Sequence, residues 1–280
     1  MKKILIVLTL VVAAFLLALP TILHKAGLHP QYSGETYALP QKRALVITTS
    51  HAVLAAAGET QGDPTGVMAS EMTHPYYTFL DGGMDVDVAS IKGGAIPVDP
   101  QTLMYMIKSP EDVRFLDDAV LQAKVQNSIA IADVDISQYD LVFVSGGWGA
   151  AYDLAQSPEL AEKISQAYYN PKKPVLGAVC HGVLGFVNAK DSEGGLLIAG
   201  RNMTGVSDKQ VNELGIEITP LHPETELRNA GAQFESQTAF RDFFATHVVI
   251  DQEQRFVTGQ NQNSGLEAAH KMMGILASRL

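Results

Sequence analysis

Cysteine and positive charge are scarce in this sequence. Cys180 is the single cysteine among 280 residues, which excludes an intrachain disulfide and any zinc or iron–sulfur site built from several thiolates. Lys and Arg number 20 against 30 Asp and Glu, for a net charge of −10. Proteins that bind nucleic acids concentrate positive charge, so no nucleic-acid partner is expected. Cys180 is therefore either apolar core filler or a reactive thiol.

Charged residues of both signs are also few, at 18%, whereas hydrophobic residues reach 46%. That composition excludes a disordered chain. No internal repeat, low-complexity tract or second linker is visible, so residues 42–280 are predicted to form one domain. A domain of this size can build its core without disulfides.

The N-terminus carries a long apolar run. Lys2 and Lys3 precede residues 4–19, which are interrupted only by Thr9, and the run continues past Pro20. With a length of about 20 residues, it matches a membrane-spanning helix and exceeds the apolar core of a cleavable signal. No good small-x-small cleavage site follows it. Residues 1–24 are thus predicted to be an uncleaved signal anchor, with a cleaved signal peptide as the alternative.

The two N-terminal lysines predict the orientation of this helix. By the positive-inside rule Lys2 and Lys3 stay in the cytoplasm, which puts the domain across the membrane. We expect a bacterial inner-membrane anchor with the domain in the periplasm, or a secreted or periplasmic protein after signal cleavage. Residues 25–41, which contain two prolines and two glycines, are expected to be a linker.

Short apolar runs alternate with amphipathic segments in the rest of the chain. The apolar runs, which suit buried parallel strands, are 44–49, 84–89, 141–145, 174–179 and 247–250. The amphipathic segments, which are predicted helices, are 66–80, 110–128, 158–169, 181–189 and 264–278. This alternation predicts an α/β domain with a mostly parallel sheet and helices on both faces.

The segment around Cys180 is the most informative. A predicted strand runs directly into Cys180, Gly182 permits a tight turn, and an apolar helix is expected to follow. This is the layout of a nucleophile elbow, which lifts the nucleophile above the carboxyl edge of a parallel sheet. The N-terminus of the following helix is expected to favour the thiolate and to lower the pKa of Cys180.

A glycine-rich loop follows another predicted strand. Gly146, Gly147 and Gly149 surround Trp148 there. Glycines let backbone N–H groups converge, and the N–H groups of Gly147 and His181 are predicted to form an oxyanion hole. Gly146 and Trp148 are predicted to line the pocket.

Eight histidines raise the question of a metal site. None lies in a ligand spacing such as HExxH, and the most suggestive group is His51, His74 and Glu71. Isolated histidines are more often packed or exposed than bound to metal. No metal and no other cofactor is therefore expected.

A series of short motifs completes the pattern. They are EMTHP at 71–75, DVDVASIKGG at 85–94, PVDP at 97–100, YDLVFVSGG at 139–147, AVCHG at 178–182, GRNMTG at 200–205, ETEL at 224–227 and TGQN at 258–261. From residue 44 to residue 280 the chain resembles the DJ-1/PfpI superfamily, with its class I glutamine amidotransferase-like fold. Within it, the chain resembles the Hsp31-like branch of glyoxalase III enzymes.

The resemblance implies a flavodoxin-like fold with Cys180 at the elbow, Glu71 hydrogen-bonded to its sulfur, and His181 as its catalytic partner. Relatives are often dimers, so a homodimer is a further expectation. Many relatives also have a histidine where Trp148 stands, and an acid that orients the catalytic histidine. Gln210 lies near the expected position of that acid, and Asp208 is the candidate substitute.

These residues lead to one hypothesis and two alternatives. The hypothesis is cofactor-independent conversion of a 2-oxoaldehyde, such as methylglyoxal, to a 2-hydroxy acid, such as lactate, through a hemithioacetal on Cys180. The first alternative is a non-catalytic stress protein, either a holdase chaperone or a thiol redox sensor. The second is a cysteine hydrolase or deglycase of the same superfamily. Glutaminase activity is excluded because neither His247 nor His270 begins the His-x-Glu pair that it needs.

Overall fold

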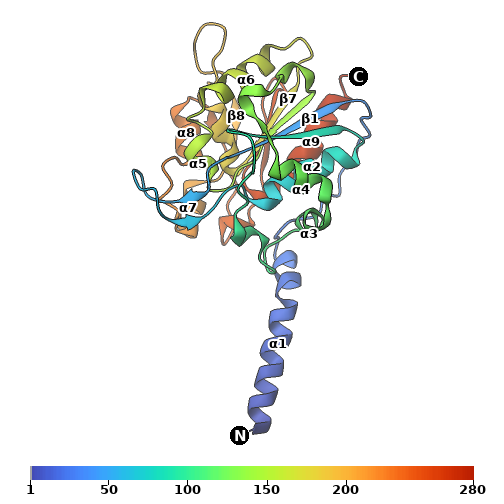
Figure 1. Cartoon of the computed structure of the whole chain (residues 1–280), viewed down its shortest axis with the longest axis vertical. Helices are drawn as coiled ribbons and strands as arrows, with labels where there is room; N and C mark the ends of the chain where they lie inside the picture. The colour runs from blue at the N-terminus through green and yellow to red at the C-terminus, as the bar shows by residue number, and fades with distance from the viewer. Residues whose placement is uncertain (1) are drawn as a thin grey trace.

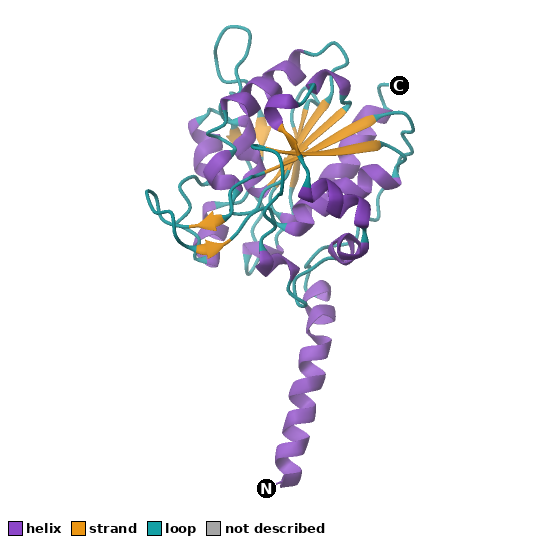
Figure 2. Ribbon diagram, in the orientation of Figure 1, coloured by secondary structure: helices purple, strands orange, loops and turns teal. Residues whose placement is uncertain are grey.

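A seven-stranded sheet forms the centre of the domain in the computed structural model, which describes residues 2–280 (Figures 1 and 2). The strand order is β10-β11-β7-β6-β1-β4-β5. The bounds are β1 Arg43–Thr48, β4 Asp85–Ser90, β5 Ile129–Ala130, β6 Leu141–Val144, β7 Val175–Val179, β10 Val248–Ile250 and β11 Phe256–Gly259. All neighbours pair in parallel except β10, which is antiparallel to β11 at one edge. The predicted mostly parallel sheet is confirmed.

Helices cover both faces of this sheet (Figure 2). The α-helices of the domain are α2 Ala69–Asp81, α3 Pro110–Asp117, α4 Ala119–Gln126, α5 Ala150–Asp153, α6 Pro158–Tyr169, α7 Asp208–Leu214, α8 Pro223–Asn229 and α9 Gly265–Ala277. The 3₁₀ helices are η1 Pro100–Leu103, η2 Ile131–Asp133, η3 Ile136–Gln138, η4 Cys180–Phe186, η5 Asp242–Phe244 and η6 Gln262–Ser264. Two small sheets, β2 Val53–Leu54 with β3 Asp63–Pro64 and β8 Asn202–Met203 with β9 Gln233–Phe234, flank the main one.

The core divides into two layers because successive side chains of a strand point to opposite faces. In β6, Phe143 packs with α2 and α9, whereas Val142 packs with α6 and η4. Both faces of the central strands are buried, which is why these strands read as continuous apolar runs.

The strand register sets the position of the site. Val144 at the end of β6 pairs with Ala178 near the end of β7. The loops that follow these two strands, which carry Gly146 and Cys180, therefore emerge side by side at the carboxyl edge of the sheet.

Several elements differ from the predictions. The helix predicted over 110–128 is two helices, because Asp118 takes an extended conformation and its side chain caps the N–H groups of Val120 and Leu121. The residues after Cys180 form the 3₁₀ helix η4 rather than an α-helix. Strand β10 is antiparallel, and β11, α7 and α8 have no counterpart among the predicted elements.

Helix α1, Lys2–Lys25, extends away from the domain and buries none of its residues (Figure 1). It is long and apolar enough to cross a membrane, a property it shares with signal sequences. The chain then turns at Gly27, whose φ is positive, and enters the domain. In the segment 25–41, predicted as a linker, the side chains of Leu28, His29 and Leu39 are buried against the domain.

Candidate active site

Cys180 occupies the sharp turn between β7 and η4. Its φ is +57°, a left-handed conformation that is strained for a residue with a side chain and is typical of a nucleophile elbow. A Cβ at Gly182 would collide with the backbone of Val144 and Ser145, so only glycine lets η4 pack this closely on the end of β6. The predicted elbow geometry is thus present.

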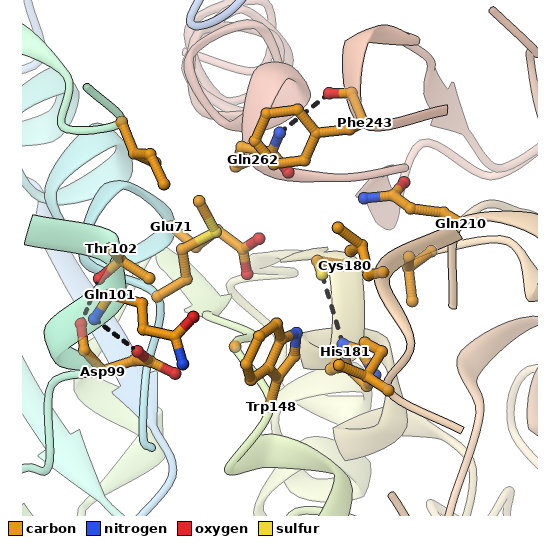
Figure 3. Close-up of a pocket in the computed structure, with 16 residues that line it drawn as sticks. Glu71, Asp99, Gln101, Thr102, Trp148, Cys180, His181, Gln210, Phe243 and Gln262 are labelled. Atoms are coloured by element: carbon orange, nitrogen blue, oxygen red, sulfur yellow. Dashed lines mark hydrogen bonds between the residues drawn. The ribbon is translucent and has the colours of Figure 1, made fainter. Parts of the chain in front are cut away.

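The Cys180 side chain faces a cavity of about 160 Å³ at the carboxyl edge of the sheet (Figure 3). Residues from distant parts of the sequence line it: Met68, Glu71, Asp99, Gln101, Thr102, Ile107, Gly147, Trp148, Cys180, His181, Val206, Gln210, Leu214, Ile216, Phe243 and Gln262. The lining is mostly apolar; His181 lies beside the sulfur, whereas the polar residues Asp99, Gln101 and Thr102 lie on the other side of the cavity (Figure 3). Such a cavity suits a substrate that reacts at one end and is otherwise apolar.

Glu71 lies in the first turn of α2 and is fully buried. The hydroxyl of Ser145 donates to the Glu71 backbone carbonyl at 2.9 Å, which ties this turn to the loop after β6. Burial raises the pKa of the Glu71 carboxyl to about 8, although the Cys180 thiol and the N–H groups of Gly146 and Gly147 oppose the rise. Glu71 is therefore mainly protonated at neutral pH.

Two glycines make room for this arrangement. A Cβ at Gly146 would lie 2.5 Å from Oε2 of Glu71 and 2.7 Å from the backbone nitrogen of His181. Gly147 has a φ of +95°, and a Cβ there would collide with the backbone of residues 66–68. Gly146, predicted to line the pocket, is not among the lining residues; it lies between the Glu71 carboxyl group and the elbow.

The thiol pKa differs from the prediction. Burial and the neighbouring Glu71 carboxylate raise the pKa of Cys180 well above its usual value, while the N–H groups of His181 and Gly147 oppose the rise. The predicted lowering rested on the N-terminus of an α-helix beneath the thiol, whereas Cys180 begins a short, fully buried 3₁₀ helix. When Glu71 is protonated, its carboxyl group no longer repels the thiolate, so the protonation states of the two residues are coupled.

His181 lies directly beside the sulfur. Its Nδ1 is 3.4 Å from Sγ of Cys180, whereas its Nε2 is buried and has no hydrogen-bond partner among residues 2–280. Burial, with a smaller effect from His222, lowers the pKa of His181 to about 3. The ring is thus neutral at physiological pH and can accept a proton from the thiol.

The residue expected to orient His181 does not do so directly. Asp208 accepts a hydrogen bond from Thr225 Oγ1 at 3.0 Å and makes none to His181 in the described chain. Gln210 instead is buried at the cavity wall, and its Oε1 accepts from Asn261 Nδ2 at 3.2 Å. Within residues 2–280, His181 therefore has no acidic partner within hydrogen-bond distance.

The remaining lining residues fall into two groups. Trp148, predicted to line the pocket, does so beside Cys180 and His181 (Figure 3). Phe243 and Gln262 line it as well but were not singled out from sequence, although the TGQN motif ends one residue before Gln262. Within residues 2–280, no three His, Cys, Asp or Glu side chains converge as a metal ion would require.

Comparison with known proteins agrees with this geometry. The profile of the DJ-1/PfpI family matches residues 64–274. Glyoxalase 3 of Candida albicans is 28% identical over 225 residues, covering 76% of this chain and 91% of its own length. The glutathione-independent glyoxalase HSP31 of Saccharomyces cerevisiae is 28% identical over 181 residues, covering 64% of this chain and 73% of its own.

Solved structures show the same similarity. The Rapid Encystment Protein of 24 kDa from Francisella tularensis superposes with a TM-score of 0.76 at 32% identity, over 84% of this chain and 99% of that one. Glyoxalase III from Candida albicans superposes with a TM-score of 0.74 at 25% identity, over 84% of this chain and 97% of that one. The flavodoxin-like fold is confirmed, and the chain belongs to the DJ-1/PfpI family.

Proposed function

We propose that this protein is a glutathione-independent glyoxalase, which converts a 2-oxoaldehyde and water into a 2-hydroxy acid. The observation that carries the proposal is that the Cys180 thiol lies 3.4 Å from a neutral His181 and shares one small buried cavity with a protonatable Glu71. Relatives named as glyoxalases from two yeasts support the same activity.

In the first step, the sulfur of Cys180 attacks the aldehyde carbon. The thiol proton passes to Nδ1 of His181, 3.4 Å from the sulfur, only as the carbon–sulfur bond forms, because a ring with a pKa of about 3 is too weak a base to deprotonate the buried thiol beforehand. A hemithioacetal oxyanion forms, and the N–H groups of Gly147 and His181 are placed to stabilise it. The oxyanion then takes the proton from His181, which leaves a neutral hemithioacetal and a neutral ring for the next step.

The second step moves a proton between adjacent carbons. A base removes the hydrogen from the former aldehyde carbon, giving an enediol, and an acid returns a proton to the neighbouring carbon. His181 with Glu71 as its relay supplies this pair, since a carboxyl group with a pKa of about 8 gains and loses a proton near neutral pH. The resulting thioester is hydrolysed by water, which releases the 2-hydroxy acid and restores the thiol.

Substitution of Cys180 tests the activity. Purified Cys180→Ala is expected to lose methylglyoxal consumption and lactate formation, both followed by NMR, while keeping its fold by circular dichroism. Unchanged turnover in Cys180→Ala would refute the mechanism. If neither protein turns over methylglyoxal but both suppress the aggregation of an unfolded client, the holdase alternative is correct instead.

We also propose that α1 is a signal anchor in a bacterial inner membrane, with the domain in the periplasm. Its length and apolar composition, together with Lys2 and Lys3 at one end, support this orientation. Carbonate extraction and N-terminal sequencing of the expressed protein test it, because a cleaved signal peptide would give a soluble protein that lacks α1. We also propose that the protein forms a homodimer. Light scattering tests the oligomeric state.

A further inference from the structure

The chain leaves α1 and enters the domain at the edge of the sheet that carries Cys180. The backbone N–H of His29 donates to Asn263 Oδ1 at 2.8 Å, and its ring Nε2 lies 2.7 Å from the carbonyl of Ile107. Ile107 lines the catalytic cavity, and so does Gln262, the neighbour of Asn263. Helix α1 is thus attached beside the cavity and not at the opposite end of the domain.

Exposed apolar side chains lie on the two segments that reach this attachment point, residues 100–108 and 240–244. Met104, Tyr105 and Phe240 are 45%, 57% and 97% exposed. The Tyr105 hydroxyl donates to the backbone carbonyl of Leu17 in α1 at 3.3 Å. Leu23 is the last apolar residue of α1, and Leu17 lies six residues before it, which is about 9 Å along the helix axis. Tyr105 therefore contacts α1 within its apolar part.

The segments that bear these side chains also form the cavity wall. Residues 100–108 contribute Gln101 and Ile107 to the lining, and η5 contributes Phe243. The η5 segment lies near the junction too, since a Cβ at Gly27 would be 3.8 Å from the carbonyl oxygen of Phe244. The same two segments, residues 100–108 and 240–244, therefore carry exposed apolar side chains and also line the reaction cavity.

We propose that α1 holds these two segments against the lipid bilayer, and that the cavity takes apolar 2-oxoaldehydes, long-chain alkylglyoxals, from the membrane. The proposal rests on the glyoxalase function and the membrane anchor proposed above. Tyrosine and other large apolar side chains next to a spanning helix are typical of residues at the membrane interface. The apolar lining, which includes Met68, Leu214 and Ile216, suits an alkyl chain.

The geometry is tested without any activity measurement. The full chain is reconstituted in phosphatidylcholine vesicles whose acyl chains are brominated, in a Trp148→Phe background that removes the single native tryptophan. Tyr105→Trp fluorescence is expected to fall by at least half. Leu280→Trp, at the exposed C-terminus on the side of the domain away from α1, is expected to keep its intensity (Figure 1).

Two results would overturn this geometry. If α1 resists carbonate extraction but the tryptophan at position 105 is not quenched, the domain is held away from the bilayer and the inference is wrong, whereas the anchor stands. If that tryptophan is protected by self-association of the protein, shown by concentration-dependent light scattering, the apolar patch is an interface between copies and the inference is also wrong.

The substrate class is tested with a pair of variants in plain phosphatidylcholine vesicles. Met104→Glu/Phe240→Glu is expected to lower kcat/KM for octylglyoxal about fivefold or more and to leave methylglyoxal turnover unchanged, because methylglyoxal arrives through water. The control Leu280→Glu should change neither. Equal rates with octylglyoxal in all three proteins would overturn the inference. Absence of turnover with both aldehydes in the unsubstituted protein would refute the glyoxalase function, whatever the quenching shows.

Discussion

A Cβ on residue 146 would stand 2.5 Å from Oε2 of Glu71, so glycine at this position is what allows the carboxyl group to reach the elbow. The same Cβ would lie 2.7 Å and 2.8 Å from the backbone nitrogens of His181 and Gly182. A backbone position with three such neighbours cannot relax by moving one flexible side chain. Gly146 therefore couples the position of Glu71 to the geometry of the loop around Cys180.

Gly146→Ala is expected to abolish most methylglyoxal turnover and to cost about 1–3 kcal/mol of unfolding free energy through overpacking. Activity and urea denaturation measure the two effects. Gly185→Ala is the matched control, because its Cβ would meet only side-chain carbons of Leu160 and Val144 from 3.1 Å outward. Comparable losses in both variants would show that the position of Glu71 is not the cause.

Glu71 is expected to impose an upper limit on the active pH range. Its carboxyl group has a pKa of about 8, so the proton that it relays is lost as the pH rises through that value. The kcat of the unsubstituted protein should fall above pH 8. In Glu71→Gln the residual rate should be low and should lack this limb. An identical alkaline limb in Glu71→Gln would assign it to another group, with Cys180 the first candidate.

The same carboxyl group also makes stability depend on pH. A glutamate that titrates at 4.5 when unfolded and at about 8 when folded holds its proton in the folded state across this interval. Stability is thus fully present below pH 4.5 and falls as the pH rises toward 8. Glu71→Gln removes this dependence. Its Tm is expected to exceed that of the unsubstituted protein at pH 8 by more than at pH 4.5, measured by calorimetry; a constant difference would contradict the raised pKa.

Titration of His181 is not expected to affect the rate between pH 5 and pH 7. Burial lowers its pKa to about 3, so the ring stays neutral and able to accept the thiol proton down to pH 5. The kcat/KM for methylglyoxal should therefore show no inflection between pH 5 and pH 7. An inflection near 6.5 that disappears in His181→Asn would show that the ring is more hydrated than this structure has it.

Gln210→Glu introduces an acid at the cavity wall. The Asn261 Nδ2 group, 3.2 Å from the present amide oxygen, can donate equally to a carboxylate. A negative charge in the same cavity should raise the pKa of His181. The kcat/KM for methylglyoxal should then begin to fall at low pH within the measured range. Glu213→Gln, a carboxyl substitution elsewhere on α7, serves as the control. No displacement of the profile would mean that position 210 does not interact with His181.

The sequence predicts those parts of the fold whose cause is local. Strands β1, β6 and β7 are buried on both faces and therefore appear as unbroken apolar runs. The elbow is predictable because a cysteine and a glycine follow such a strand. By contrast, β11 has four residues, including Thr258 and Gly259, and α7 and α8 have seven each, which is too short for a clear period.

The site is predictable to the same extent and for the same reason. Gly147, Cys180 and His181 meet because the ends of neighbouring parallel strands share one edge of the sheet. Phe243 and Gln262 reach the cavity through loops whose paths leave no periodic signal in the sequence. The pKa of Cys180 was mispredicted because a helix-dipole argument takes no account of desolvation, which only the folded environment reveals.

The burial of Leu28 and His29 restricts where a protease can cleave between α1 and the domain without disturbing the fold. A protease that cut after His29 would remove a buried side chain from the rim of the cavity and the donor to Asn263. A processed and still intact protein would have to begin at or before Leu28. Its new α-amino group would then add a positive charge close to His29, whose ring Nε2 lies 2.7 Å from the carbonyl of Ile107 in the cavity wall.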